Sequence, residues 1–243
     1  MFRNLKTCRR SFLSVCVLGA LLFVMSAPGA YADLILTLNV GNAAIAACCG
    51  SGPFGTVDLA QTTSSLVTAT VTLNNPYLFV DTGGAGAFTF NIANIVFSNL
   101  TFVVNPASVA AGFSSTVSGN GTFNQHEDGF GFFDYAIQGD ANHTSGGSTP
   151  IGQLLTFTIP TKDASNLPLS DFQLNSTGGG TASFIAADII RPASGNLSAV
   201  TGFVGSDPGG GPPQSVVPEP STMGLLGTVL VGLGWAVRKK LHS

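Results

Sequence analysis

The sequence of 243 residues has almost no basic residues between its two ends. Four of its nine Lys and Arg residues lie within the first ten positions, and three lie at positions 238–240. Only Lys162 and Arg191 remain in between, whereas eleven acidic residues give residues 33–216 a net charge of −9. Because nucleic-acid binding depends on Lys and Arg side chains that neutralise phosphates, this charge excludes DNA and RNA as partners.

The sequence also lacks the common catalytic motifs. A Gly-x-Ser-x-Gly elbow, a phosphate-binding loop and a dinucleotide fingerprint are all absent. His126 and Glu127 begin like a zinc-protease motif, but that motif needs a second His where this chain has Phe130. We therefore predict that the protein is not an enzyme and that it needs no cofactor, with calcium as the one ion left open.

The first 32 residues form an export signal of three parts. Basic residues at the start precede an apolar run, residues 12–25, which is too short to span a bilayer comfortably. Ala30 and Ala32 then occupy the −3 and −1 positions that signal peptidase accepts. We predict an N-terminal signal helix that signal peptidase removes after Ala32, with an uncleaved anchor as the alternative.

Removal of residues 1–32 would leave only two cysteines, Cys48 and Cys49. Adjacent cysteines can close a vicinal disulfide, remain free thiols or pair between chains in an oxidising compartment. The glycines and proline at positions 50–53 predict a loop around the pair. A structural role is favoured over a redox role because the chain has no Cys-x-x-Cys spacing.

The C-terminus is predicted to be a membrane tail. Residues 207–216 form a Gly/Pro linker, and residues 223–237 are apolar and uncharged. A transmembrane helix over about residues 221–237 would be about 25 Å long, slightly less than a typical hydrocarbon core. The basic cluster of Arg238, Lys239 and Lys240 then holds this end in the cytoplasm and leaves residues 33–217 outside.

A short extended motif stands immediately before the predicted helix: Val217, Pro218, Glu219 and Pro220. Each proline fixes φ and disfavours helix in the residue before it, so the motif is an exposed, extended peptide beside the membrane. An ordinary single-pass anchor with a proline-rich stalk is the alternative.

The order of motif, glycine-rich span and basic end in residues 217–240, within the predicted tail 217–243, resembles the PEP-CTERM sorting signal of Gram-negative bacteria that make extracellular polymer. The same tail is also catalogued as an ice-binding protein C-terminal domain, a label that describes the tail alone. The resemblance implies processing by an exosortase. The protein would then be anchored by its C-terminal helix and would reach the cell surface or the medium after processing.

Residues 33–206 read as strands joined by turns. Ten runs show period-two alternation or β-branched enrichment between Gly, Pro, Asn and Ser clusters. They are residues 34–40, 66–73, 87–92, 95–104, 116–123, 130–138, 154–159, 172–175, 182–190 and 199–204. We predict an all-β domain, an antiparallel β-sandwich or jelly roll. With no Trp in this segment, its fifteen phenylalanines must supply much of the core.

The segment from residue 124 to residue 140 holds the candidate site residues. Glu127, Asp128, Asp134 and Asp140 carry hard oxygen ligands for calcium, and Glu127 with Asp134 could form the acid/base pair of a glycoside hydrolase. The favoured interpretation is simpler: a turn over residues 126–129 leads into a strand whose Phe133, Tyr135 and Ile137 face the core.

Asp140 also begins a segment with the alternating oxygen spacing of a calcium loop. An EF-hand is excluded, since Ser145 replaces the required glycine and Ile151 stands where the bidentate glutamate belongs. Only an irregular calcium site is compatible with these residues.

Three functions remain open at this level. The first is an exported, non-catalytic surface or matrix protein whose domain contacts polysaccharide, protein or cells. The second is a secreted glycoside hydrolase using the acidic pair near Glu127 and Asp134. The third, binding to ice or mineral, would need a flat face with regular threonine rows, and only Thr68, Thr70 and Thr72 on one strand suggest it.

Overall fold

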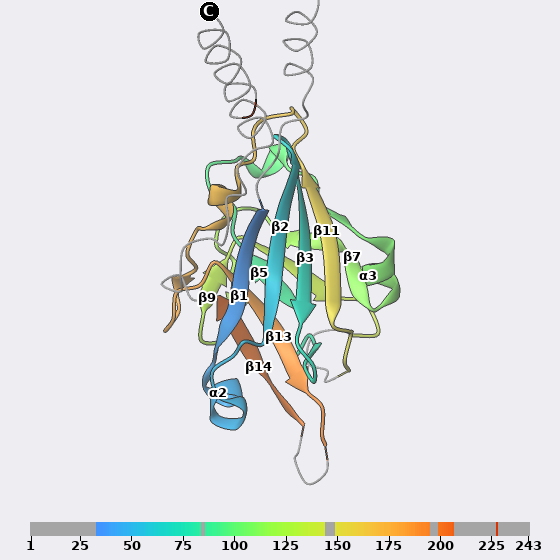
Figure 1. The fold of residues 1–243 in the computed structure, drawn as a ribbon, viewed down its shortest axis with the longest axis vertical. Helices are drawn as coiled ribbons and strands as arrows, with labels where there is room; N and C mark the ends of the chain where they lie inside the picture. The colour runs from blue at the N-terminus through green and yellow to red at the C-terminus, as the bar shows by residue number, and fades with distance from the viewer. Residues whose placement is uncertain (1–32, 84–85, 144–148, 195–198, 207–226, 228–243) are drawn as a thin grey trace, which may run out of the picture. The chain divides into compact units, whose positions relative to one another are not determined.

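The computed structural model describes residues 33–83, 86–143, 149–194, 199–206 and Gly227, and these residues are mostly β (Figure 1). The strands of the main sheet are β1 (Asp33–Gly41), β2 (Gly55–Thr63), β3 (Leu66–Leu73), β4 (Leu78–Phe79), β5 (Phe88–Phe90), β6 (Val103–Val104), β7 (Phe113–Gly119), β10 (Tyr135–Gly139), β11 (Leu154–Pro160), β13 (Ile185–Arg191) and β14 (Val200–Ser206). A smaller sheet holds β8 (Gln125–Glu127), β9 (Gly131–Phe133) and β12 (Thr177–Gly178). The helical elements are α2 (Ala43–Cys49), α3 (Pro106–Ala110), η1 (Phe97–Asn99) and η2 (Leu169–Phe172).

The main sheet is one continuous antiparallel path. Its strands follow the order β6-β11-β3-β2-β1-β14-β13-β5-β10-β7, and β4 pairs with β13 beside this path. The prediction of a mostly β, antiparallel fold is confirmed. The described strands do not form the two separate main sheets of a sandwich or jelly roll, because β1 joins β2 on one side and β14 on the other.

This single sheet curls around its own core until it is nearly closed. Strands β5 and β11 are far apart in the strand order, yet the ring of Phe157 lies 6.0 Å from that of Phe88 and 5.3 Å from that of Phe90. The edge strands β6 and β7 also approach each other. In Figure 1, β1, β2, β3 and β11 lie side by side in front of β13 and β5. The curl replaces the second sheet that the sequence suggested.

Phenylalanine supplies much of this core, as predicted. Most of the largest fully buried side chains are aromatic: Phe54, Phe79, Phe88, Phe90, Phe113, Phe130, Phe133, Tyr135, Phe157 and Phe172. Aromatic rings pack well edge-to-face or offset, and each buries a large apolar area. The rings of Phe79 and Phe113 meet in this way, 5.2 Å apart at 74°.

The strand predictions agree best with the structure in strands that alternate apolar and polar residues, such as β3 and β11, and in the mostly buried strands β13 and β14. β1, β3, β11, β13 and β14 lie close to their predicted ranges. β2 was not predicted, because Val57 and Leu59 are its only large apolar residues and Asp58 stands between them. Both apolar side chains are nevertheless buried, and β2 pairs along its length with β1 and β3.

Two predicted strands are wrong over most of their length. Residues 95–104 form η1 and only the short β6, after Asn94 takes a positive φ of 57° that an extended strand cannot continue. Phe172 is the last residue of η2, which Pro168 precedes, and residues 173–175 form no strand. Each segment still contributes apolar side chains to the core without a strand, since Phe102 packs 5.1 Å from Tyr135 and Phe172 is 1% exposed, but Val96 and Phe97 of the first segment are exposed.

The predicted strand over residues 130–138 is divided into β9 and β10 at Asp134. The backbone N–H of Asp134 donates to the side-chain Oδ1 of Asn91 at 2.8 Å instead of to a neighbouring strand. β9 therefore joins the small sheet and β10 the main sheet. The predicted strand over residues 116–123 is shifted to β7, and the predicted turn over residues 126–129 begins at Asp128 because Glu127 ends β8.

The cysteines do not lie in the predicted loop. Cys49 is the last residue of α2, whose first turn is capped by the Asn42 side chain accepting from the Ile45 N–H at 3.3 Å. Gly50 then ends the helix with a positive φ of 75°. Cys49 forms a disulfide.

The predicted signal helix, linker and tail lie outside the described residues, with the exception of Gly227. Among the residues that the structure does describe, no helix is long and apolar enough to span a bilayer.

Candidate functional site

Three buried carboxyl groups, one from the small sheet and two from the main sheet or the chain beside it, are close enough for their charges to interact. Glu127 ends β8 and has no exposed surface, Asp188 lies in the middle of β13 and is also fully buried, and Asp81 follows β4 with 3% exposed. The backbone of Asp188 is fixed by two hydrogen bonds: its carbonyl accepts from the Val80 N–H at 3.1 Å, and its N–H donates to the Ala87 carbonyl at 3.0 Å. We call Asp81, Glu127 and Asp188 the acidic cluster.

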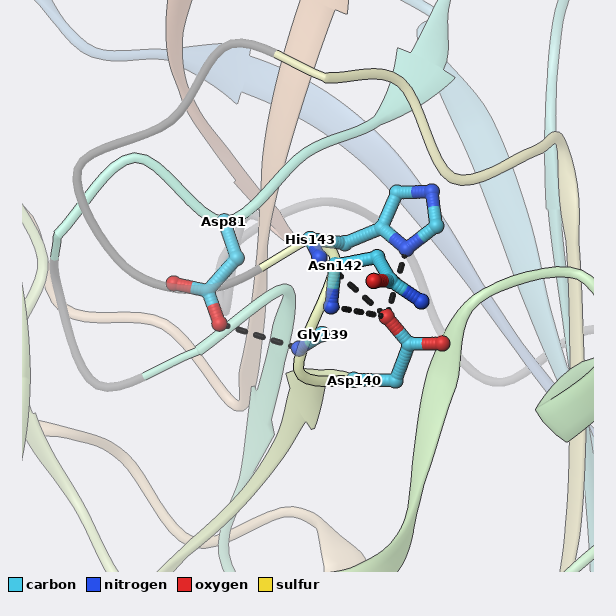
Figure 2. Close-up of polar contacts among 5 residues, drawn as sticks. All are labelled: Asp81, Gly139, Asp140, Asn142 and His143. Atoms are coloured by element: carbon cyan, nitrogen blue, oxygen red, sulfur yellow. Dashed lines mark hydrogen bonds and ion pairs between the residues drawn. The ribbon is translucent and has the colours of Figure 1, made fainter.

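The hydrogen bonds of the acidic cluster are incomplete. Asp188 Oδ2 accepts from the Thr82 N–H at 2.7 Å and from the Thr82 hydroxyl at 2.6 Å, but Oδ1 has no partner. Asp81 Oδ2 accepts from the Gly139 N–H at 2.9 Å (Figure 2). Neither oxygen of Glu127 has a hydrogen bond of normal geometry, although the Gly86 N–H is close enough to favour its charged form slightly.

The pKa of each carboxyl group in the cluster is raised. Burial is the main cause that raises the pKa of Glu127 well above 4.5, and the charges of Asp188, Asp81 and Asp128 add to it. Burial also raises the pKa of Asp188 from 3.8 to about 7, against the opposing hydrogen bonds from Thr82. Burial raises the pKa of Asp81 too. In the described ranges no Lys, Arg or His forms an ion pair with these three carboxyls.

Asp134 has surroundings of its own. It is 2% exposed, and its Oδ1 accepts from the Phe123 N–H at 3.0 Å. Burial raises its pKa, while hydrogen bonds from Phe123 and Ile92 oppose the rise. Asp134 is not among the charges that act on Glu127, whose partners are the other two members of the acidic cluster and Asp128. The structure thus pairs Glu127 with Asp188 and Asp81 instead of with Asp134.

Asp140 closes a local turn (Figure 2). Its Oδ1 accepts from the Asn142 N–H at 2.8 Å and the His143 N–H at 3.1 Å, and lies 2.7 Å from His143 Nδ1. The His143 side chain lowers the pKa of Asp140 by this hydrogen bond. One of the two carboxylate oxygens of Asp140, the residue that the sequence suggested for calcium, is thus already used within its own loop.

The four calcium candidates from the sequence are not gathered around one point. Asp128 has a side chain 75% exposed and lies 3.7 Å from His126, while Glu127 and Asp134 are buried in different surroundings. In the part of the chain that the structure describes, no group of three or more His, Cys, Asp or Glu residues is placed to hold a metal ion. Calcium binding stays a prediction.

Sequence reasoning missed two of the three cluster members. Asp188 stands inside the apolar run 185–190. A carboxyl group within a predicted core strand is unusual, and this alone could have indicated a buried polar site. Asp81 follows the buried Phe79 and Val80, and nothing local indicates that a residue more than forty positions away lies beside it. The contact depends on how the small sheet packs, which period-two patterns do not encode.

The sorting residues Val217 to Pro220, the basic cluster 238–240 and the cleavage residues Ala30 and Ala32 all lie outside the described residues. The tail is identified by comparison with known protein families. The family model described as the PEP-CTERM protein-sorting motif matches residues 216–240.

The chain carries a PEP-CTERM protein-sorting motif.

The PEP-CTERM match covers the predicted motif, span and basic end together, so the resemblance seen in the sequence is confirmed. A PEP-CTERM motif implies export, membrane-associated sorting to the cell surface and processing by an exosortase-type enzyme. No curated protein and no solved structure matches the chain. The β domain therefore has to be interpreted from its own residues.

Proposed function

We propose that this PEP-CTERM protein is exported, sorted by an exosortase to the cell surface or extracellular matrix, and has a non-catalytic binding or structural role there. The PEP-CTERM match at residues 216–240 carries this proposal. Signal peptidase would remove residues 1–32, and the C-terminal helix would hold the protein in the membrane until the tail is processed. The acidic, lysine-poor body supports an extracellular role that does not involve nucleic acid.

The glycoside-hydrolase alternative has less support. Such an enzyme places two carboxyl groups on either side of a bound sugar. Glu127 has no exposed surface, and its charged neighbours are Asp188 and Asp81. A substrate would reach Glu127 only after the surrounding chain had moved, which is why we favour the non-catalytic role.

Cell fractionation of paired variants tests the proposal. Glu219→Gln removes the charge of the sorting motif, whereas Asp207→Asn removes a charge from the linker ten residues before the motif. We expect the Glu219→Gln chain to accumulate in the membrane fraction and the Asp207→Asn chain to reach the surface like the wild type. Equal surface delivery of both variants would argue against exosortase sorting through this motif.

A further inference from the structure

The outer side of β1, β2, β3 and β11 is rich in threonine. Along each strand, buried residues alternate with residues that face outward, as in Leu34, Leu36 and Leu38 of β1. We call the outward-facing set the threonine face. It comprises Asp33, Ile35, Thr37, Thr56, Asp58, Ala60, Thr68, Thr70, Thr72, Leu154, Thr156 and Thr158. Figure 1 shows its four strands side by side.

Strand register arranges these side chains in three rows across the sheet. One row runs Thr37, Thr56, Thr72, Leu154; the next Ile35, Asp58, Thr70, Thr156; and the third Asp33, Ala60, Thr68, Thr158. Neighbouring strands are about 4.8 Å apart, and residues two apart along a strand are about 6.8 Å apart. The threonine alternation of β3 therefore extends across strands, which a search for sequence repeats cannot detect.

The hydroxyl groups of this face are available to a partner. None of its seven threonines has a side-chain hydrogen bond to another described residue, whereas Thr62 and Thr161 donate to the Leu66 and Ser165 carbonyls. Each threonine also presents a methyl group beside its hydroxyl. The result is a regular array of apolar and hydrogen-bonding groups.

The charge of the threonine face limits the kind of partner that it can bind. The face has no Lys or Arg, and its two carboxyl groups, Asp33 and Asp58, lie on the neighbouring strands β1 and β2, in adjacent rows. Burial and the charge of Asp33 raise the pKa of Asp58, and its Oδ1 has no hydrogen-bond partner. An anionic polymer would be repelled by these groups and by the acidic body. A partner without charge that offers many hydroxyl groups suits the face best.

We propose that the threonine face is a binding surface for an uncharged, hydroxyl-rich polysaccharide. This inference rests on the extracellular location given by the proposed function. The rows would exchange hydrogen bonds with sugar hydroxyls, and the methyl groups together with Ile35 and Leu154 would contact the apolar C–H faces of the sugar rings. Each contact is weak, so firm attachment comes from many copies of the protein on one polymer.

A second copy of this chain fits the face less well. Between its outermost rows and strands the face measures about 14 Å by 14 Å. A standard protein–protein interface buries about 800 Å² on each partner, more than this face offers. In a symmetric face-to-face pair the carboxyl groups of Asp33 and Asp58 would add repulsion. A flexible polymer needs no such area in one place.

Binding of the separate domain to insoluble polysaccharides tests the proposal. Residues 33–206 contain their own hydrophobic core, so they can be produced without the signal and the tail. The wild type and the double variant Thr70→Val with Thr156→Val are mixed with amorphous cellulose, chitin and starch, and with anionic alginate as a fourth polymer. Valine keeps the shape and β-propensity of threonine, so only the two hydroxyls are lost. Thr177→Val with Thr181→Val, two exposed threonines outside the face, is the matched control.

We expect the wild type to bind at least one uncharged polysaccharide, the control to bind equally and the double variant to bind about tenfold more weakly, from the loss of two hydrogen bonds. Three results would overturn the proposal: no binding to any uncharged polymer, preference for alginate, or unchanged binding by the double variant. Inhibition of ice recrystallisation that depends on Thr70 and Thr156, without polysaccharide binding, would assign the face to ice. A dimer that the double variant abolishes would assign it to a second copy. Surface delivery of the full chain is measured separately, so failure here leaves the sorting proposal standing.

Discussion

The domain of residues 33–206 is expected to lose stability as the pH rises from about 4 to about 8. Above pH 3.8 an unfolded chain has Asp188 ionised, whereas the folded chain keeps its proton up to a pKa of about 7. Folding therefore takes up a proton in this range, and the free energy of unfolding falls as the pH increases. Below about pH 4 both states are protonated, so the stability contribution is complete there.

The size of this effect follows from the two pKa values of Asp188. A difference of one pKa unit corresponds to about 1.4 kcal/mol, so the change from 3.8 to about 7 gives about 4 kcal/mol between pH 4 and pH 8. The raised pKa of Glu127 acts in the same direction. Since domains of this size are stable by about 5–15 kcal/mol, the loss would be large and measurable.

Urea unfolding followed by circular dichroism at pH 4.5, 6 and 8 measures this loss. Asp188→Asn keeps an oxygen that can accept from the Thr82 N–H and hydroxyl but cannot ionise. We expect this variant to lose most of the pH dependence and to exceed the wild type in stability at pH 8. Asp163→Asn, at an exposed carboxyl whose pKa is lowered by Ser165, is the control and should keep the wild-type decline. A wild type whose stability rises from pH 4.5 to pH 8, or an Asp188→Asn variant with an unchanged slope, would show that folding does not raise the pKa of Asp188.

Two further predictions concern the fold. Gly131→Ala should destabilise the small sheet by about 1–3 kcal/mol, because Gly131 has a φ of 91° and a new Cβ would lie 2.2 Å from the Thr177 carbonyl oxygen. Gly180→Ala, where the nearest atom is 3.7 Å from a new Cβ, is the control and should unfold thermally like the wild type. Equal melting temperatures of the two variants would contradict the close approach at Gly131. Phe157→Ala should lower the free energy of unfolding in urea by about 3–5 kcal/mol, because Phe157 joins β11 to β5 across the core. Val103→Ala, at a side chain that is 50% exposed, is the control and should lower it little. A small decrease for Phe157→Ala would show that the sheet does not close on this ring.

Much of the fold could be predicted where the alternation of buried and exposed residues is contained within a single strand. β3 and β11 alternate apolar and polar residues, and their ends agree with the prediction to within one residue. The alternation gives no information about which strands become neighbours. The closure of one sheet on itself depends on contacts such as Phe157 with Phe90, sixty-seven positions apart, and was therefore missed.

The candidate site shows the same limit. Glu127 was selected from a segment rich in acidic residues, but its predicted partner was Asp134, the nearest carboxyl group on the following strand. The division between β9 and β10 places Asp134 against Asn91 and leaves Glu127 with Asp188, from a strand sixty residues later. The tail needed no tertiary contact, because an exosortase recognises a linear signal, and it was the part read most completely from the sequence.

Mass spectrometry of the mature C-terminus shows whether the protein is sorted through its PEP-CTERM tail. The protein is isolated from a host that has its exosortase and from the same host without that enzyme. We expect the exosortase-containing cells to yield a chain that ends near residues 217–220, and the deletion strain to yield the intact chain ending at Ser243. A C-terminus at Ser243 in both strains, or the same shortened end in both, would contradict the account.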